Sequence, residues 1–161
     1  MAKNTSDLLN QRLANYESNN QYLSFYLDQE EYGIEILMVQ EIITNHRPTK
    51  VPNASEIILG MINFRGKVVP IIDLRAMFGL PPMEGDGFKI AIVLEYRKKN
   101  IGLAVDYVSD IVNLSDDNIQ PVNEDTVDDL KAEHCRGMGK IGDRLVLLLN
   151  MDKVISSDEF E

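Results

Sequence analysis

The residues best suited to chemistry are two histidines and one cysteine. His46 and His134 could act as general bases or metal ligands, and Cys135 could supply a thiolate. Each role needs neighbours, because a base requires a nucleophile and a metal requires several ligands at set spacing. The two histidines lie far apart in sequence. His134 and Cys135 are adjacent, but adjacent side chains on a strand point apart. We therefore interpret both histidines as solvated loop residues, and expect no enzyme, no metal and no cofactor.

Carboxylates are the most abundant reactive groups, with 26 Asp and Glu residues against 16 Lys and Arg. A chain this acidic offers many carboxylate pairs, so such pairs do not identify a glycosidase. Between Asp116 and Glu133, seven acidic residues accompany one lysine. A calcium loop is an alternative, but Asp116-Asp117-Asn118 lacks the alternating ligands and central glycine of an EF-hand. We expect a solvated loop with short helical turns.

The net charge of −10 limits the class of partner. Nucleic acid and anionic membrane surfaces are bound mainly through clustered Lys and Arg, so we expect neither nucleic-acid binding nor direct membrane contact. No apolar run reaches the roughly 18 residues that span a bilayer, and the first ten residues lack a signal-peptide core. A single cysteine excludes an internal disulfide. These features predict a cytoplasmic location.

The strongest pattern in the chain is an internal duplication. Residues 33–43 recur 69 positions later as residues 102–112, each copy starting with glycine. The stretch that starts at Gly60-Met61 and runs to Leu74 recurs 77 positions later, starting at Gly137-Met138. Two copies account for nearly the whole chain, which predicts two small β-modules packed together. We expect equivalent places for three pairs of residues: Ile34 and Leu103, Ile42 and Ile111, and Val69 and Val146.

The modules must be built from short strands. Tyr22 to Leu27 alternates between two faces, as a half-buried strand does, and Arg65-Gly66 is a hairpin turn between 61–64 and 67–72. Short strands at regular spacing with glycine-bearing turns indicate small barrels. Ser55 carries a capping signal before Glu56, and Asn150 is expected to cap a closing helix that runs to about Ser156. Further strands are expected at 32–36, 39–44, 89–96, 100–106, 111–114 and 144–149.

The duplication and the expected strands divide the chain into five predicted segments. They are an N-terminal helix or extension (1–20), a first β-barrel subdomain (21–80), a linker (81–87), a second β-barrel subdomain (88–150) and a C-terminal helix (151–161).

One long stretch resembles a known family. Gly60-Met61-Ile62-Asn63-Phe64-Arg65-Gly66-Lys67-Val68-Val69-Pro70-Ile71-Ile72-Asp73-Leu74-Arg75, together with Val39-Gln40-Glu41-Ile42 and Pro52-Asn53, is similar to the CheW family of bacterial chemotaxis. The segment 102–110 looks like its second-half counterpart, and the resemblance covers roughly Gln21 to Val154. Two departures are Phe64, where leucine is usual, and Glu124-Asp125-Thr126, where some relatives carry an apolar side chain used in side-to-side contact.

The resemblance implies a fold and a role. The implied fold is all-β with short helices: two five-stranded SH3-like β-barrels packed around a shared hydrophobic seam. The implied role is a non-enzymatic adaptor, a scaffold for signal transduction in a two-component system. Its partners would be the regulatory domain of the histidine kinase CheA and the cytoplasmic tip of methyl-accepting chemoreceptors. In chemoreceptor arrays, the state of the receptors would control autophosphorylation of the kinase.

Two groups of residues are candidates for that role. Glu41 and Arg65 resemble a family pair expected to meet in space, with Arg65 holding a partner-facing surface in shape; the alternative is an ordinary surface ion pair. Candidate partner-binding residues are Met38, Val39, Ile90, Ala91, Gly102 and Val105, and core packing is the alternative for each.

The docking mode follows from one strand. In residues 89–94, Ile90 and Ile92 alternate with Ala91 and Val93, so both faces of the strand are apolar. Both faces must therefore be covered, by the sister barrel or by a partner. We expect receptors to dock as a helical hairpin in a groove between the barrels, and the kinase to dock on apolar strand-edge surface.

Two other classes of function are alternatives. An adaptor fused to a receiver domain would need a longer chain than 161 residues. An enzyme or small-ligand carrier would need a pocket with converging polar groups, which no cluster in the sequence nominates.

Overall fold

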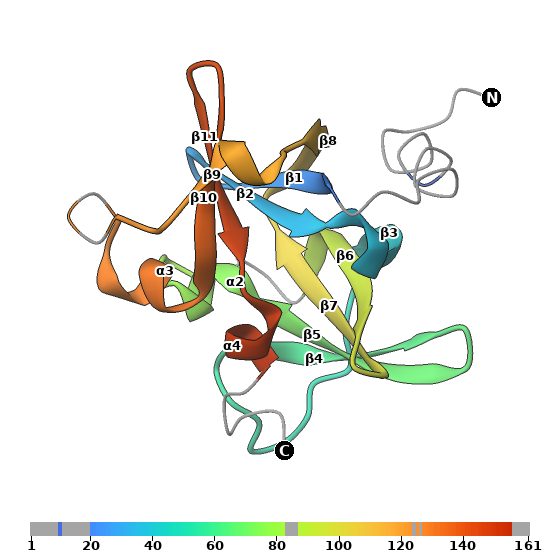
Figure 1. The fold of residues 1–161 in the computed structure, drawn as a ribbon. Coiled ribbons are helices and arrows are strands. Elements are labelled where there is room, and N and C mark those ends of the chain that lie inside the picture. Colours follow the sequence, from blue (N-terminus) through green and yellow to red (C-terminus); the bar gives the residue numbers. More distant parts are fainter. Residues whose placement is uncertain (1–9, 11–19, 83–86, 124, 126, 156–161) are drawn as a thin grey trace.

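The structure is a computed structural model that describes residues 10, 20–82, 87–123, 125 and 127–155. These residues form two curled sheets with a few short helices (Figure 1). The strands are β1 (Gln21–Leu27), β2 (Glu30–Glu35), β3 (Val39–His46), β4 (Ile58–Phe64), β5 (Lys67–Asp73), β6 (Phe88–Tyr96), β7 (Lys99–Val105), β8 (Tyr107–Asn113), β9 (Ile119–Gln120), β10 (Cys135–Ile141) and β11 (Arg144–Leu149). The helices are η1 (Ile36–Met38), α2 (Leu74–Met77), η2 (Asp116–Asn118), α3 (Asp129–Glu133) and α4 (Met151–Ile155).

The strands pair in two sheets of matching order. One sheet runs β8-β1-β2-β11-β10-β9, and the other runs β3-β6-β7-β5-β4. Most neighbours are antiparallel, but β2 pairs with β11 and β7 pairs with β5 in parallel. The predicted all-β class with short helices is confirmed, and the first sheet gains a sixth strand through the two-residue β9.

The sheets do not follow the predicted subdomain boundaries. Strands β1 and β2, from segment 21–80, join β8, β10 and β11, which come from segment 88–150. In return, β6 and β7 from the second segment join β3, β4 and β5. The two copies therefore exchange their first two strands, a possibility that the sequence left open.

The pairing registers confirm the duplication position by position. Ile34 lies opposite Leu23 in one sheet, and Leu103 lies opposite Ile92 in the other, 69 residues on in both strands. The other two pairs match in the same way: Ile42 and Ile111 on β3 and β8, and Val69 and Val146 on β5 and β11. Even the irregularities repeat, because a register shift before Gly60 on β4 recurs before Gly137 on β10.

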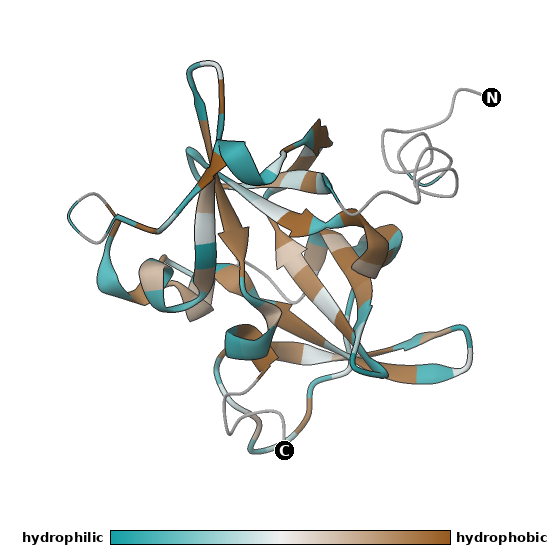
Figure 2. Cartoon of the chain, viewed as in Figure 1, coloured by the Kyte–Doolittle hydropathy of each residue, from teal (hydrophilic) through white to brown (hydrophobic). Residues whose placement is uncertain are grey.

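Apolar side chains form one shared core and two smaller ones. The largest cluster takes buried residues from both sheets, including Leu23, Ile42, Leu103 and Leu147. Each sheet also encloses its own cluster, around Val69 and Ile71 in one and around Val146 and Leu148 in the other. Figure 2 shows many of the brown, hydrophobic residues on the strands at the centre of the molecule. The predicted hydrophobic seam is therefore the shared cluster.

A glycine in each copy allows the parallel strands to approach. Gly102 lies opposite Ile71, and a Cβ at this position would stand 2.3 Å from the Ile71 Cδ1 atom. Gly33 lies opposite Leu148, where a Cβ would stand 3.0 Å from the Leu148 Cδ2 atom. The glycines of the repeat are thus explained by packing of the neighbouring strand.

Several predicted boundaries need correction. The capping signal at Ser55 starts a turn, since Ile58 N–H donates to the Ser55 carbonyl at 3.0 Å, and β4 begins at Ile58. Strand β8 starts four residues earlier than predicted, at Tyr107. The strand Cys135–Ile141 was not predicted, because its glycines weaken the alternation signal. The predicted helix in 1–20 and the end of the closing helix lie outside the described residues, apart from Asn10 and Asn20.

Asn10 lies against the edge of the second sheet. Its side-chain amide donates to the Ile42 carbonyl at 3.0 Å and accepts from the Ile42 N–H at 2.8 Å. Because β3 is an edge strand, these bonds satisfy backbone groups that no neighbouring strand meets.

Candidate partner-binding surfaces

Glu41 and Arg65 meet, as the family resemblance implied. The Arg65 guanidinium lies 2.9 Å from the Glu41 carboxylate. Arg65 and Gly66 both have positive φ, 51° and 79°, as a two-residue hairpin turn of the primed type requires. Glu41 lies on β3 at one edge of the sheet, and the hairpin includes β4 at the other edge. The ion pair therefore joins the two edges of a curled sheet.

This pair is largely exposed to solvent. The Arg65 side chain is 66% exposed and the Glu41 side chain 33%. Arg65 also stacks over the Phe64 ring, with its guanidinium carbon 4.9 Å from the ring centroid. An exposed pair of this kind contributes about 0–1 kcal/mol to stability. Its main consequence is a fixed local shape beside β3, since the planar guanidinium holds both partners in one orientation.

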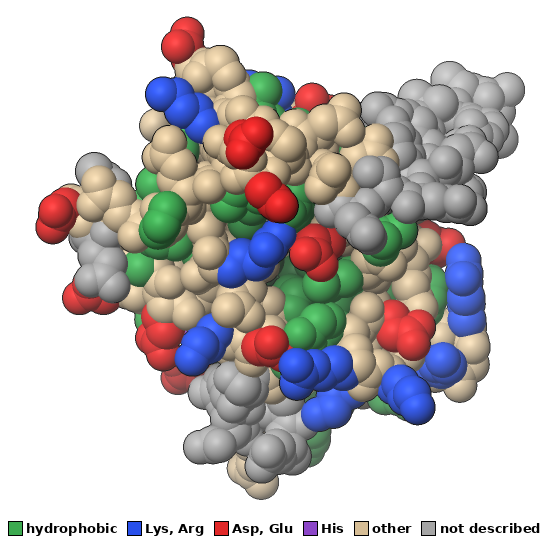
Figure 3. Space-filling model, in the orientation of Figure 1, with side chains coloured by type: hydrophobic (Ala, Val, Ile, Leu, Met, Phe, Trp, Pro, Cys, Tyr) green, Lys and Arg blue, Asp and Glu red, His purple; other side chains and the backbone are tan. Residues whose placement is uncertain are grey.

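The Arg65 turn belongs to a basic corner, which we define as Arg65, Lys67, Arg97, Lys98 and Lys99. Strands β5 and β7 run in parallel, so their first residues lie at the same end of the sheet. Figure 3 shows Lys and Arg side chains gathered at this end, at the lower right of the molecule. All five residues are exposed. The corner is a local excess of positive charge on a chain of net charge −10.

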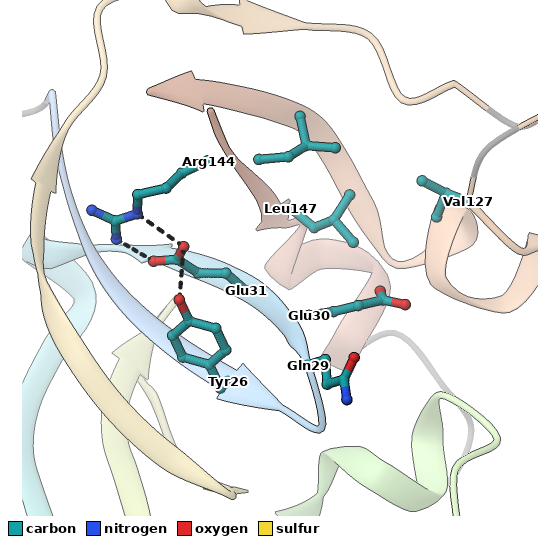
Figure 4. A pocket seen from close by; sticks show the side chains of 8 residues that line it. Tyr26, Gln29, Glu30, Glu31, Val127, Arg144 and Leu147 are labelled. Carbon is teal, nitrogen blue, oxygen red and sulfur yellow. Dashed lines mark hydrogen bonds and ion pairs between the residues drawn. The ribbon is translucent and has the colours of Figure 1, made fainter. Parts of the chain in front are cut away.

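The second copy carries a related ion pair. Asp110 on β8 corresponds to Glu41, and the Arg144 guanidinium on β11 lies 3.1 Å from it, although Arg144 corresponds to Lys67 and not to Arg65. Arg144 also bonds Glu31, a carboxylate that is 5% exposed and that accepts hydrogen bonds from Ser24 and, at 3.2 Å, from the Tyr26 hydroxyl. Figure 4 shows the Arg144 and Tyr26 side chains converging on Glu31.

The protonation of Glu31 follows from these contacts. Burial acts to raise the pKa of Glu31, but the hydrogen bonds from Arg144 and Ser24 outweigh it, and the pKa lies below its ordinary value. The hydrogen bond to Glu31 raises the pKa of Arg144 in turn. Both groups therefore stay charged at neutral pH, and the pair stabilises the fold of this sheet.

A pocket of about 380 Å³ opens next to this cluster. Tyr26, Glu30 and Glu31 line it together with apolar Leu147 and Val127 (Figure 4). Three of its polar groups, on Tyr26, Glu31 and Arg144, already bond one another. No histidine or cysteine lines it. The pocket does not carry the constellation of a nucleophile and a base that hydrolytic chemistry needs.

The six apolar candidates from the sequence fall into two groups. Ala91, Gly102 and Val105 are buried, with Ala91 0% and Val105 1% exposed, so these residues belong to the core and not to the surface. Met38, Val39 and Ile90 are half-buried at the border of the shared core. Leu37, which the sequence analysis did not select, is 53% exposed beside them. Its signal in the sequence was weak, because its neighbours Ile36 and Met38 are also apolar.

The strand that is apolar on both faces is covered within the chain. Ile92 and Leu94 of β6 pack into the shared core, and Ala91 and Val93 pack into the core of their own sheet. Of the two alternatives left open, the neighbouring sheet covers this strand, and residues 91–94 need no partner for burial.

Comparison with known proteins defines the family. A family model described as CheW-like domain matches residues 21–159. The chemotaxis protein CheW of Klebsiella aerogenes is 38% identical over 92% of this chain and 89% of its own length. The probable chemotaxis protein CheW of Rhizobium etli is 34% identical over 90% and 93%. The chain belongs to the CheW family. The crystal structure of the scaffolding protein TtCheW from Thermoanaerobacter tengcongensis agrees, with a TM-score of 0.76, 28% identity, and coverage of 88% and 96%.

Membership in the CheW family makes this protein a chemotaxis scaffold or adaptor, and the remaining reactive groups are consistent with that role. His46 bonds the Thr44 carbonyl and His134 bonds the Leu130 carbonyl, each within its own segment. Burial raises the pKa of the Cys135 thiol to about 12, so it is not a nucleophile at neutral pH. Within the described residues, no group of three or more His, Cys, Asp or Glu could hold a metal ion. None of the helices that the structure describes is long and apolar enough to cross a membrane.

Arg75, the last residue of the CheW-like motif, has a structural role that the sequence analysis missed. Its guanidinium lies 2.7 Å from Asp28, in the β1–β2 turn, and 2.7 Å from Asp106, between β7 and β8. It also donates to the Pro81 carbonyl at 2.7 Å. Arg75 thus ties α2 to turns of both sheets.

The second copy repeats this contact with the charges reversed. Arg97 corresponds to Asp28, and Asp152 corresponds to Arg75; Arg97 lies 3.0 Å from Asp152. Both turn residues have a left-handed backbone, with φ of 54° for Asp28 and 50° for Arg97. A comparison of identical residue types could not find this repeat, because it preserves the pairing and exchanges the signs.

Proposed function

We propose that this protein couples the cytoplasmic tips of methyl-accepting chemoreceptors to the regulatory domain of the histidine kinase CheA in the cytoplasm, and so controls autophosphorylation of the kinase. The observation that carries the proposal is the exposed Glu41–Arg65 pair, which joins the two edges of one sheet beside half-buried Met38 and Val39. This arrangement gives a shaped apolar surface with a polar border, and not a catalytic pocket.

The proposed receptor surface centres on η1 and β3. Leu37, Met38 and Val39 supply apolar contact there, with Ile90 on the adjacent strand, and a helix with anchors three and four residues apart fits such a surface. For the kinase we propose apolar strand surface. Val68 on β5 and Leu145 on β11 occupy equivalent positions and are 69% and 47% exposed, which makes them the candidates.

Co-purification tests the proposal directly. The protein is mixed with a receptor cytoplasmic fragment and with CheA, separately and together, and kinase autophosphorylation is followed in the ternary mixture. We expect complexes with both partners and receptor-dependent stimulation only when this protein is present. Absence of binding to either partner, with folded protein, would contradict the proposal.

A further inference from the structure

A second pocket, of about 330 Å³, opens at the basic corner. Its apolar lining comes from Val68, Pro70, Ile101 and Ile155, and its polar lining from Lys67, Lys98, Lys99 and Asn100. The residues come from the starts of β5 and β7 and from the end of α4. The pocket therefore combines an apolar floor with a rim of three lysines.

The three lysines are not neutralised within the described part of the chain. Arg65 is bonded to Glu41 and Arg97 to Asp152, but Lys67, Lys98 and Lys99 form no ion pair with any described residue. Three that stand together without one favour an anionic ligand.

The apolar lining of this pocket favours a ligand that also carries an apolar group. Val68 is 69% exposed, the highest fraction among the large hydrophobic residues in the described part of the chain. Ile155, which also lines the pocket, is half-buried. The matching ligand is a short segment that presents carboxylates to the lysines and one apolar side chain to Val68 and Ile155.

We propose that the chain supplies this ligand itself, through residues 156–161, Ser-Ser-Asp-Glu-Phe-Glu. These residues lie outside the described part and follow directly on Ile155, which lines the pocket. They contain three carboxylates and one phenylalanine, the two chemistries that the pocket calls for. Six residues reach at most about 20 Å, so the segment cannot dock far from this corner. Tethering also gives it an effective concentration in the millimolar range. The inference does not depend on the proposed function.

Amide NMR on the full chain tests the proposal. The ¹H–¹⁵N heteronuclear NOE of Phe160 is measured at about 0.05 M and about 0.5 M salt. We expect a value close to that of β5 at low salt and a fall at high salt, because screening shortens the reach of the lysine charges from about 10 Å at 0.1 M to 3 Å at 1 M. A Phe160 amide that is mobile at both salt concentrations would overturn the proposal.

Charge reversal identifies the binding site. The double variant Lys98→Glu/Lys99→Glu should release Phe160 at low salt, since both positions are exposed and carry none of the core. Lys140→Glu is the matched control, an exposed lysine on the strand of the other copy that enters the β10–β11 turn. It should leave the Phe160 signal unchanged. Equal effects of the two changes would show a general charge effect and reject the pocket.

Competition in trans separates the possible occupants. A synthetic peptide of residues 156–161 is titrated into the intact chain and into a chain that ends at Ile155. We expect binding to the shortened chain, with shifts at Lys99 and Val68, and at least tenfold weaker binding to the intact chain. Equal affinity for both would refute docking in cis, as would release of Phe160 on dilution, which would assign the pocket to a second copy.

Discussion

At the scale of single residues, the informative contacts are ion pairs at the edges of the two sheets. Glu41 and Asp110 occupy corresponding positions and each pairs with an arginine, but the Glu41–Arg65 pair is exposed and the Asp110–Arg144 pair is anchored on buried Glu31. The physical difference is burial. An exposed pair contributes little to stability and leaves its surface open to partners, whereas a buried carboxylate must keep its hydrogen bonds.

Arg65→Ala should impair coupling more than folding. The pair is exposed, so its loss should lower the free energy of unfolding by about 1 kcal/mol or less. Receptor-dependent kinase stimulation should fall several-fold, because the surface beside β3 loses its fixed shape. Thermal unfolding and reconstituted kinase activity measure the two effects, with Lys140→Ala as the control. A large loss of stability with a proportionate loss of coupling would make Arg65 structural only.

Glu31→Gln should change how stability depends on pH. At neutral pH the change should cost about 1–3 kcal/mol, because hydrogen bonds from Arg144 and Ser24 to a charged group are weakened. The pKa of Glu31 is lowered in the folded state, so its contribution is complete above the ordinary value of about 4.3 and is lost as the pH falls through the folded pKa. Urea unfolding from pH 7 to 3 should show the difference between wild type and variant constant at first, then shrinking. A difference that grows towards acid pH would contradict the assignment.

At the scale of elements, the glycines of the repeat set the distance between parallel strands. Gly102 and Gly33 correspond, and both face a large apolar side chain of the neighbouring strand, Ile71 or Leu148. Antiparallel hairpins form locally, but the parallel contacts join the two copies. The glycines therefore support the strand exchange between the copies.

Gly102→Ala should destabilise the fold by about 1–3 kcal/mol, the usual cost of overpacking. The added Cβ would stand 2.3 Å from the Cδ1 atom of Ile71, which is fully buried and cannot turn away freely. Ile71→Val removes that atom and should cost about 0.5–1.5 kcal/mol alone. In a double-mutant cycle by chemical denaturation, the double variant should cost less than the two single changes together. Strict additivity would show that the two positions do not interact.

At the scale of the whole molecule, the two copies exchange their first two strands, and the two resulting sheets share one core. The largest cluster draws on both sheets, and Arg75 bridges turns of both. This arrangement leaves few large apolar residues exposed among those described: Leu37, Val51, Val68, Tyr107, Leu130 and Leu145. We therefore expect partner binding through apolar contact to use small surfaces, which suits a reversible adaptor.

Receptor binding should survive high salt. If Leu37, Met38 and Val39 form the receptor surface, apolar contact drives binding, and aliphatic contact tolerates salt where charge pairing does not. Titration of a receptor fragment at low salt and near 0.5 M salt measures this, and we expect less than a tenfold change in affinity. Leu37→Ser should weaken binding at both salt concentrations. Loss of most affinity at high salt would show that charge drives recognition.

The sequence by itself determined the features that depend on local spacing and on repetition. Strand alternation predicted the all-β class, and the turn at Arg65-Gly66 was predicted because a primed turn needs positive φ. The order of the repeated blocks predicted which positions of the two copies correspond, and the strand-pairing registers confirm this correspondence. The Glu41–Arg65 contact came from the family resemblance, which places the two residues together across 24 positions of the chain.

Only the tertiary structure decided which strands share a sheet and which apolar residues are covered. Period-two alternation assigns a residue to a face, but it does not name the neighbour of that face. Ala91 and Val105 were therefore open as partner contacts until the packing showed them buried. The strand exchange and the bridge from Arg75 to Asp28 and Asp106 join residues from distant parts of the chain. Such contacts depend on how the sheets curl and pack, which no local pattern encodes.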